Sequence, residues 1–344
     1  MPRLRRVDCS GPGFARRRAG RGFVYVAEDG RRITDKETVA RIRALAIPPA
    51  WEDVWICPVP TGHIQAVGTD AAGRRQYRYH DAWRARRDQE KFDHMLEFAQ
   101  ALPALRKVIA ADLAGDEPSR ARVLACATRL LDIGFFRIGT EGYAEQNQSY
   151  GLATMQKRHV RVRGDEVRFD YRSKSGKMRI QSVVDPEVAE VVEALKRRRG
   201  GGPELLAWRD GRRWRDVRSS DINDYIKDAT GGEFTAKDFR TWNATVLASV
   251  SLAVAATATS ATARKRAVAW AMKEVAHWLG NTPAVCRSSY VDPRVVDRYQ
   301  AGVTVHAVLS RLGEGAGFGQ LSTQGAIEEA VLDLLAETPA GAAA

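Results

Sequence analysis

The spacing of apolar residues changes near residue 90, and this change constrains the fold more than any other feature of the sequence. Before it, short stretches alternate between apolar and polar residues, as half-buried strands do. These stretches are Gly22–Ile33, Trp55–Val59, His63–Gly68 and Gln76–His80. After it, apolar residues recur every three or four positions, which is the period of an amphipathic helix. The sequence therefore predicts an α+β chain with a small β-rich N-terminal domain and a larger, mainly α-helical domain.

Charge, glycine and proline set the expected boundaries. Residues 1–20 hold three consecutive arginines among glycines, so we expect a flexible basic arm there. We expect the β-rich domain over 21–90, with one helix that begins after a cap at Asp35 and stops at Pro48. The helical domain is expected over 91–310. An acidic helix at Ala326–Ala336 and a loose tail would complete residues 311–344.

The helical domain carries a β-hairpin insert. Alternating stretches are followed by the turns Gly164-Asp165 and Ser175-Gly176, which predicts three strands. The strands are expected at His159–Arg163, Glu166–Tyr171 and Lys177–Val184. Helices are expected on both sides of this insert, at 82–102, 104–113, 119–134, 186–196, 219–229, 236–258 and 265–279, with a mobile connector at 257–263. Trp242 and Trp278 are expected in the core.

The net charge of the chain is strongly positive and unevenly distributed. The formal charge is +12 and the pI is near 9.8. Residues 1–91 hold 19 basic and 11 acidic residues, whereas residues 311–344 carry a net charge of −4. A polyanion is therefore the expected partner, with nucleic acid first and an anionic membrane surface second. The N-terminal domain is the part most strongly drawn to phosphate.

Several classes of protein are excluded by missing patterns. No apolar run is long enough to span a membrane, and the basic N-terminus lacks the apolar segment of a secretory signal. Cys9, Cys57, Cys126 and Cys286 are scattered, which fits neither a zinc site nor a disulfide framework and favours a reducing cytoplasm. No glycine-rich phosphate cradle occurs. We therefore expect no metal site and no cofactor.

A small set of polar residues fits the chemistry of DNA strand cleavage. Breaking a phosphodiester without a metal needs a nucleophile, donors for the non-bridging oxygens and an acid for the leaving oxygen. Arginine suits the donor role because its fork binds two oxygens and stays charged. The chain offers, in order, Arg137, Lys174, Arg240, Asn281 and Tyr290. Each alone is more often a solvated cation or a half-buried tyrosine, so the order carries the argument.

This order, together with its flanking residues, resembles the type IB DNA topoisomerases, specifically the small poxvirus-like form found in bacteria. The resemblance extends from about Gly22 to Tyr299. It rests on Thr69–Tyr79, on Arg137-Ile138-Gly139 with Tyr143, Asn147, Ser149 and Thr154, on Lys237–Thr241, and on Leu279–Tyr290. It implies the catalytic fold that type IB topoisomerases share with tyrosine recombinases.

The resemblance also implies a role for each residue of the series. Tyr290 would attack the scissile phosphate and form a 3′-phosphotyrosyl enzyme, while Arg137 and Arg240 would hold the non-bridging oxygens. Lys174 would be the general acid for the 5′-oxygen, with Lys177 as the alternative if the hairpin register differs. Asn281 would donate to a non-bridging oxygen, at a position where many relatives carry histidine.

The same resemblance implies how the chain meets DNA. Arg74, Arg75, Gln76, Tyr77, Tyr79 and Lys237 would contact the duplex. Tyr77 and Tyr79 are expected on one face of a strand, because residues two apart on a strand point the same way. The implied activity is relaxation of positive and negative supercoils without ATP or metal. The implied form is a monomer that closes around duplex DNA in the cytoplasm, in association with the nucleoid.

Two other functions compete with this interpretation. Tyrosine recombinases share the catalytic fold, but they carry a helical N-terminal domain and usually have His-x-x-Arg where this chain has Lys237 to Arg240. A non-enzymatic nucleoid-binding protein would explain the positive charge but not the ordered series. The β-rich N-terminal domain favours the topoisomerase.

Overall fold

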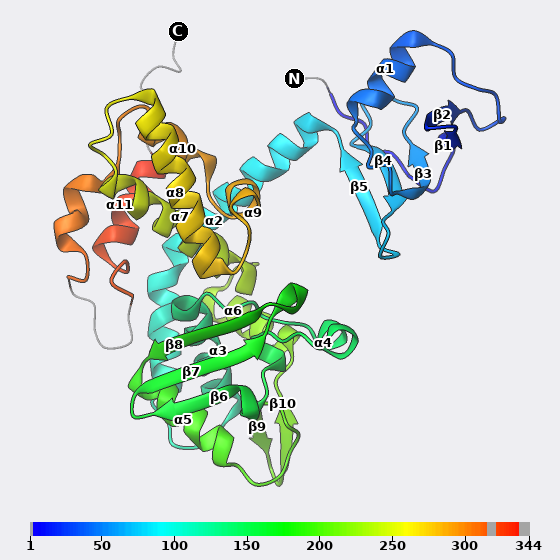
Figure 1. The fold of residues 1–344 in the computed structure, drawn as a ribbon. Helices are drawn as coiled ribbons and strands as arrows, with labels where there is room; N and C mark the ends of the chain where they lie inside the picture. Colours follow the sequence, from blue (N-terminus) through cyan, green and yellow to red (C-terminus); the bar gives the residue numbers. More distant parts are fainter. Residues whose placement is uncertain (1–2, 315–320, 337–344) are drawn as a thin grey trace. The chain divides into compact units, whose positions relative to one another are not determined.

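The computed structural model describes residues 3–314 and 321–336, and the chain divides into two compact units (Figure 1). The first unit comprises Met1–Asp93 and the second comprises His94–Ala344. Helix α2, Asp81–Leu113, runs through the boundary between them. The loose tail that we expect after Ala336 lies outside the described residues. None of the described helices is both long and apolar enough to cross a membrane.

The first unit is built on a five-stranded antiparallel sheet in the order β2-β1-β3-β4-β5. The strands are Phe14–Ala19, Gly22–Val26, Glu52–Ile56, Ile64–Thr69 and Arg75–Tyr79. Helix α1, Lys36–Ala44, begins where the Asp35 carboxylate accepts a 2.8 Å hydrogen bond from the Thr38 amide. The cap and the helix confirm what the sequence predicts here, because an aspartate satisfies an amide that the first helical turn leaves unpaired.

The expectation of a flexible basic arm over 1–20 is wrong for its second half. Phe14–Ala19 is strand β1, which pairs with both β2 and β3. The Arg16 guanidinium donates to the carbonyl oxygens of Ile47, Pro48 and Trp51, and it lies 4.2 Å from the centre of the Phe23 ring. The strand could not be recognised from three consecutive arginines, which show no alternation of apolar and polar residues. In the structure Arg17 is exposed, whereas Arg16 is partly buried and bonded to backbone carbonyls.

Strand β1 lies beside the small core of the first unit. Ile42, Val54, Ile56 and Ala66 are buried there. Six partly buried apolar side chains pack around these four: Phe14, Tyr25, Ile33, Leu45, Ile47 and Trp51. The side chain of Phe14 belongs to the segment expected to be flexible, so the arm is ordered by apolar burial as well as by hydrogen bonds.

The second unit is mainly helical. Its long helices after α2 are α3 (Arg120–Gly134), α5 (Pro186–Arg197), α6 (Ser219–Thr230), α7 (Ala236–Val254) and α8 (Ala261–Leu279). Shorter helices are α4 (Glu141–Asn147), α9 (Pro283–Ser289), α10 (Pro293–Gln300) and α11 (Ala326–Ala336). The predicted α+β class, with a β-rich first part and a helical second part, is confirmed.

Helix α2 continues through Pro103, where the sequence analysis places a break between two helices. A proline removes one backbone hydrogen bond within a helix. Here a stripe of buried residues runs past it without a change of register: Met95, Phe98, Leu102, Leu105, Ile109 and Leu113. Burial of this stripe outweighs the missing hydrogen bond, and the two expected segments form one helix.

The β-hairpin insert forms a three-stranded antiparallel sheet, β6-β7-β8, in the expected place. The strands are Val160–Arg163, Glu166–Arg172 and Met178–Val184. Helices α3 and α5 contact this sheet and cover one face of it (Figure 1). Tyr171 of β7 lies directly opposite Arg179 of β8. A separate two-stranded hairpin, β9 (Ala207–Asp210) and β10 (Arg213–Asp216), follows α5.

The two tryptophans expected in the core have different environments. Trp242 is fully buried in α7, as predicted. Trp278 is 47% exposed near the end of α8, so its placement in the core is wrong. Its ring contacts Phe135 and His277, with 5.7 and 6.0 Å between ring centres. Within the segment expected as a connector, α8 already begins at Ala261, capped by Ser260.

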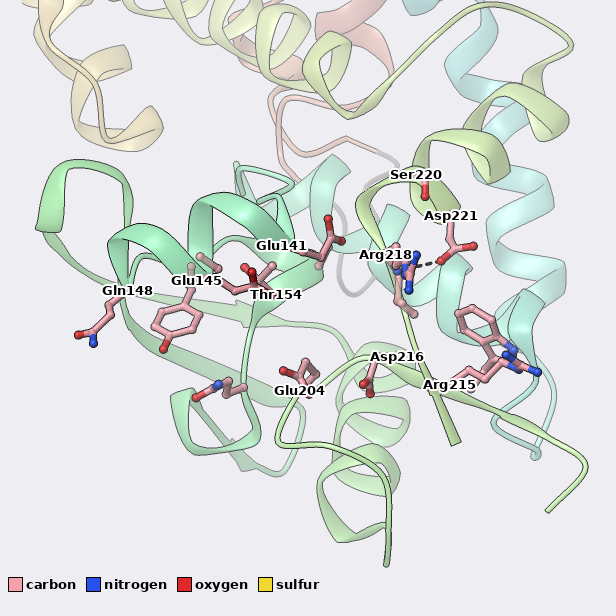
Figure 2. A pocket seen from close by; sticks show the side chains of 16 residues that line it. Glu141, Glu145, Gln148, Thr154, Glu204, Arg215, Asp216, Arg218, Ser220 and Asp221 are labelled. Carbon is pink, nitrogen blue, oxygen red and sulfur yellow. Dashed lines mark hydrogen bonds between the residues drawn. The ribbon is translucent and has the colours of Figure 1, made fainter. Parts of the chain in front are cut away.

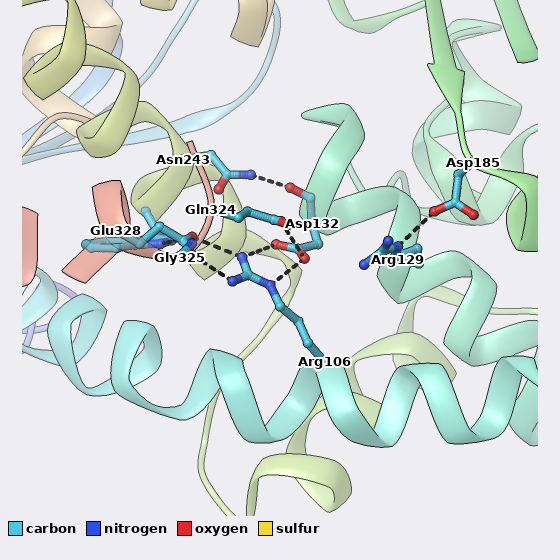
Figure 3. A network of polar contacts seen from close by, with 9 residues as sticks. Arg106, Arg129, Asp132, Asp185, Asn243, Gln324, Gly325 and Glu328 are labelled. Carbon is cyan, nitrogen blue, oxygen red and sulfur yellow. Dashed lines mark hydrogen bonds and ion pairs between the residues drawn. The ribbon is translucent and has the colours of Figure 1, made fainter. Parts of the chain in front are cut away.

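A buried polar network ties the C-terminal helix α11 to the rest of the second unit (Figure 3). Arg106 of α2 donates to both carboxylate oxygens of Asp132 of α3, at 2.8 and 3.0 Å, and to both of Glu328, at 2.6 and 2.9 Å. The Trp242 indole also donates to Glu328, at 2.8 Å. The acidic helix, expected as part of a separate C-terminal segment, is therefore bound to α2, α3 and α7.

The network predicts that Glu328→Ala destabilises the protein by about 3 kcal/mol. The partly buried Arg106 guanidinium loses one of its two carboxylate partners, and the buried Trp242 indole N–H loses its acceptor. Chemical denaturation followed by circular dichroism measures this loss. Asp333→Ala, on an exposed position of the same helix, is the control and should change stability by less than about 0.5 kcal/mol. If the two substitutions lowered the free energy of unfolding equally, the network would not contribute the stability that we expect of it.

Candidate active site

Arg137 lies where the chain leaves helix α3 in an extended segment. Phe135 caps the helix in the left-handed conformation, with φ of 55°. The segment then runs beside residues 151–153, where Leu152 and Ala153 donate to the carbonyls of Arg137 and Ile138 at 2.8 and 2.7 Å. A Cβ at Gly139 would lie 2.6 Å from Gly151 Cα, so this close approach requires glycine. The crossing holds the backbone of Arg137 in place.

Arg240 is buried under the site and connects two chain segments. Its Nη1 donates to the Phe135 carbonyl at 2.6 Å, and its Nη2 donates to the Leu279 carbonyl at 2.9 Å. Its Nε has no hydrogen-bond partner among the residues that the structure describes. Burial and the nearby Arg137 guanidinium lower the pKa of Arg240 to about 10. The two carbonyl acceptors therefore hold the guanidinium in place and leave its Nε–H without an acceptor among the described residues.

Tyr290 follows helix α9 and lies against Arg240. The Arg240 Cζ is 5.2 Å from the centre of the Tyr290 ring. The Tyr290 amide donates to the Cys286 carbonyl at 3.0 Å, and the Thr245 hydroxyl donates to the Tyr290 carbonyl at 3.3 Å. The backbone on which the phenol stands is therefore fixed from two helices, α9 and α7.

The charges around the Tyr290 hydroxyl favour its ionised form. Burial raises the pKa of this hydroxyl, but Arg240, Arg137 and Lys237 together lower the pKa by more, so the net shift is downward. A phenolate is a far better nucleophile than a phenol. The neighbouring cations therefore increase the ionised fraction of the Tyr290 hydroxyl.

Asn281 completes the cluster from the end of α8. Gly280 ends that helix in the left-handed conformation, with φ of +62°. Arg137 Nη2 donates to the Gly280 carbonyl at 2.9 Å and to the Asn281 Oδ1. This contact sets the orientation of the amide. The Asn281 Nδ2 finds no nitrogen or oxygen acceptor among the described residues and faces the thiol of Cys286.

Four of the five predicted catalytic residues are thus brought together: Arg137, Arg240, Asn281 and Tyr290. The fifth, Lys174, lies on the exposed tip of the β7–β8 hairpin, within the short 3-10 turn Lys174–Gly176. Within the described part of the chain, no hydrogen bond or ion pair joins it to the cluster. Lys177, the alternative acid, is exposed at the same tip, and its carbonyl accepts from Ser173.

The chain matches known proteins along both units. The family model of the catalytic core of eukaryotic DNA topoisomerase I matches residues 80–307, and that of the N-terminal domain of bacterial DNA topoisomerase IB matches residues 22–70. DNA topoisomerase 1B of Acanthamoeba polyphaga mimivirus is 31% identical over 294 residues, which cover 84% of this chain and 88% of the viral protein. DNA topoisomerase 1 of Daucus carota is 26% identical over 160 residues, 46% of this chain and 19% of the plant protein.

The chain belongs to the type IB DNA topoisomerases. It is therefore an isomerase whose substrate is DNA. The predicted family and function are confirmed, and these matches give no support to a recombinase or to a nucleoid-binding protein without activity.

In the first unit of the topoisomerase, strand β5 presents the predicted tyrosine face. Tyr77 and Tyr79 are 40% and 39% exposed, and their rings stack with 6.0 Å between centres. The guanidinium of Arg75 lies 5.8 Å from the centre of the Tyr77 ring. Strand β5 is an edge strand of its sheet, so this aromatic face is open to a partner. The shared face is confirmed, and its contact with DNA remains a prediction.

The other predicted DNA contacts have mixed environments. Asp70 accepts hydrogen bonds from both Arg74 and Gln76, each at 2.9 Å, and these bonds lower the pKa of Asp70 to about 2. Gln76 is thereby held on the face opposite to the tyrosines. Lys237 is exposed in the first turn of α7, whereas Arg240, one turn further, is buried.

A surface cleft of the second unit is lined by a different set of residues (Figure 2). It has a volume of 1170 Å³, and none of the predicted catalytic residues lines it. Carboxylates dominate its polar lining: Glu141, Glu145, Glu204, Asp216 and Asp221. A phosphate would be repelled there. Within residues 3–314 and 321–336, no group of three or more His, Cys, Asp or Glu side chains is arranged to hold a metal ion.

Sequence reasoning missed two members of the site, Tyr171 and Arg179. Both are on the β7–β8 hairpin, and both influence the electrostatics of the cluster. The signal for Arg179 was present in the alternation of β8. Arg179, Gln181 and buried Val183 are spaced two residues apart, so their side chains lie on the same, inward face of β8. An apolar residue is usual on that face. A charged residue at such a position indicates a polar partner inside.

The charge arrangement predicts that the Tyr290 hydroxyl has a lower pKa than a free phenol. Because cations stabilise the phenolate, the ionised form appears at lower pH than for a free phenol of pKa about 10. NMR of protein labelled at the tyrosine Cζ measures this directly, with Tyr290→Phe to assign the signal. Lys237→Gln should raise the pKa, and Lys265→Gln, on an exposed part of α8, should leave it unchanged. A Tyr290 signal that titrates at or above 10 would refute the arrangement.

Proposed function

We propose that Tyr290 of this topoisomerase cleaves one DNA strand and holds its 3′ end as a phosphotyrosyl ester. The phenolate oxygen bonds to phosphorus while the bond from phosphorus to the 5′-oxygen breaks. The leaving oxygen takes a proton from Lys174 and becomes a 5′-hydroxyl. The observation that carries this proposal is the convergence of Arg240, Arg137 and Asn281 on Tyr290, all held by backbone carbonyls or by one another.

The unused donors of the cluster match the charge of the reacting phosphate. The Nε of Arg240 and the Nδ2 of Asn281 are buried without nitrogen or oxygen acceptors. Buried donors are almost always paired in proteins, so unpaired ones at a reactive centre favour a ligand that accepts from them. In the proposed transition state the non-bridging oxygens are those acceptors, and fixed donors stabilise the charge that develops on them.

Religation would reverse the same steps. The phosphotyrosyl ester conserves the energy of the broken phosphodiester, so the 5′-hydroxyl can attack it without ATP. Between cleavage and religation, torque in the DNA drives rotation about the intact strand, and supercoils of either sign relax. Arginine and amide donors take the place that a metal ion holds in other nucleases, so the reaction would need no divalent ion.

We further propose that the enzyme acts as a monomer in the bacterial cytoplasm, on nucleoid DNA. The catalytic set lies within one chain, and all four cysteines are free thiols, which fits a reducing compartment. The exposed tyrosines of β5 and the surrounding arginines would add contacts to sugars, base edges and phosphates. Because phosphate contacts dominate such binding, its affinity should fall steeply with salt.

The deciding experiment is relaxation of positively and negatively supercoiled plasmid in EDTA and without ATP. The wild-type enzyme should relax both, and Tyr290→Phe should relax neither, because it lacks the nucleophile. Tyr299→Phe is a matched control, since that hydroxyl donates to the Ala255 carbonyl away from the cluster; it should retain activity. Failure of the wild type despite DNA binding, or activity in Tyr290→Phe, would overturn the proposal.

A second prediction concerns the amide of Asn281. Asn281→Asp replaces the N–H donor by a carboxylate that pairs with Arg137 and repels the phosphate, so cleavage should slow by about 10²–10³-fold. Asn281→His keeps an N–H donor and should lose less than about tenfold. Single-turnover cleavage of a nicked or short duplex at saturating enzyme measures both rates. Equal rates for the two variants would exclude a donor role for this side chain.

A further inference from the structure

Arg179 is a partly buried cation that the proposed chemistry does not use. It lies on strand β8, opposite Tyr171 of β7, at the base of the hairpin whose tip carries Lys174 and Lys177. Its Nε donates to the Gln181 side chain, its Nη2 donates to the Trp278 carbonyl, and its guanidinium also hydrogen-bonds with the Tyr171 hydroxyl. With these donors engaged by protein groups, Arg179 is better suited to hold the site together than to bind phosphate.

The contacts of Arg179 reach the loop that carries Asn281. Trp278 is three residues before Asn281, and a Cβ placed on Gly280 would lie 2.7 Å from Arg179 Nη1. The same Gly280 Cβ would lie 3.4 Å from Nη1 of Arg137. Glycine at 280 therefore serves two purposes, because it adopts the left-handed cap and leaves room for two guanidinium groups over its Cα.

Gln181 extends the same connection to the segment that carries Arg137. Its Nε2 donates to the Gly134 carbonyl at 2.8 Å, while its Oε1 accepts from Arg179. Strand β8 thus contacts the end of α3 through Gln181 and the end of α8 through Arg179. Both attachments occur within three residues of one strand, so they fix the base of the hairpin against the two segments that Arg240 also joins.

Among the described residues, the hairpin tip makes only local hydrogen bonds. The Ser173 amide and hydroxyl donate to the Lys177 carbonyl, and the Gly176 amide donates to the Ser173 carbonyl. Among the described residues, neither lysine side chain is held by a hydrogen bond or ion pair. The direction in which the tip points therefore depends on the base of the hairpin. Helices α3 and α5 pack against this sheet, and Arg179 and Gln181 add attachments to the ends of α8 and α3.

We propose that Arg179 is a positioning residue, which aligns the general-acid hairpin with the Asn281 loop so that the tip lysine reaches the leaving 5′-oxygen. This inference rests on the proposed function, since it presupposes that a tip lysine is the general acid. A guanidinium serves here because one planar group bonds a side-chain amide, a phenol and a backbone carbonyl at once, which a lysine cannot do. Loss of Arg179 should therefore impair proton donation more than attack by Tyr290.

The test compares two DNA substrates that differ in one atom. One has the normal 5′-oxygen at the scissile bond, and the other has a 5′-bridging sulfur, whose thiolate leaves without being protonated. Single-turnover cleavage of each is measured at saturating enzyme. Arg179→Gln should slow cleavage of the normal substrate by about 10²-fold, the usual range for a lost general acid. The sulfur substrate should restore the rate to within about threefold of that of the wild type.

Two variants calibrate the comparison. Lys174→Ala should show the same rescue by sulfur, and Arg137→Ala should show none, because its loss affects the phosphate rather than the leaving group. The double variant of Arg179→Gln with Lys174→Ala should be no slower on normal DNA than Lys174→Ala alone, since both changes remove one step. Lys177→Ala is measured in the same way. If the sulfur substrate rescues Lys177→Ala and not Lys174→Ala, Lys177 is the general acid and replaces Lys174 in these comparisons.

Each remaining outcome is decisive. A defect in Arg179→Gln that persists with the sulfur substrate, or no defect at all, overturns the positioning role. Should the variant unfold, as judged by circular dichroism, Arg179→Lys and Tyr171→Phe provide the same comparison with smaller losses of packing. If no tip lysine is rescued by sulfur, the general-acid assignment and this inference fail together, whereas cleavage that depends on Tyr290 would leave the topoisomerase mechanism standing.

Discussion

The two hydrogen bonds that Arg240 donates to the Phe135 and Leu279 carbonyls hold the catalytic unit of this enzyme in register. They connect helix α7 to the ends of α3 and α8, and these are the places where Arg137 and Asn281 leave regular structure. The Tyr290 ring packs against the same guanidinium. A buried cation normally carries a large desolvation cost. Here the two carbonyl acceptors and the Tyr290 phenol offset that cost. The positive charge of Arg240 in turn lowers the pKa of the Tyr290 hydroxyl.

Further polar contacts support this centre from behind. Asn243, one turn after Arg240, donates to the Asp132 carbonyl at 2.8 Å, and the Asp132 carboxylate is held by Arg106 together with Glu328 of α11 (Figure 3). The end of α3 is therefore fixed by α2, α7, β8 and the C-terminal helix. Buried polar contacts of this kind rigidify the segments that they join. Rigid support of this kind is what keeps donors aimed at a transition state without reorganisation.

Local patterns in the sequence were sufficient to predict much of the fold. Four of the five strands of the first unit, the cap at Asp35 and the three-stranded insert follow from apolar spacing and turn residues, which act over a few neighbours. The same patterns failed at Phe14–Ala19 and at Pro103. In both places contacts distant in sequence decide the outcome: backbone carbonyls of residues 47, 48 and 51 order Arg16, and a continuous buried stripe carries α2 past its proline.

The sequence by itself determined which chemical groups are available: a tyrosine, two arginines, an amide and a hairpin lysine, in the order that marks the family. Only the tertiary structure decided that Arg137, Arg240, Asn281 and Tyr290 meet, and that Arg179 joins them from β8. The hydrogen bond between Arg137 and Asn281 joins residues 144 positions apart in the sequence, and that between Arg179 and Trp278 joins residues 99 positions apart. Contacts of such range depend on how whole helices and strands pack. The charge of buried Arg240, for example, is compensated by the carbonyls of Phe135 and Leu279. Because these residues are far from Arg240 in the sequence, no local pattern identifies them.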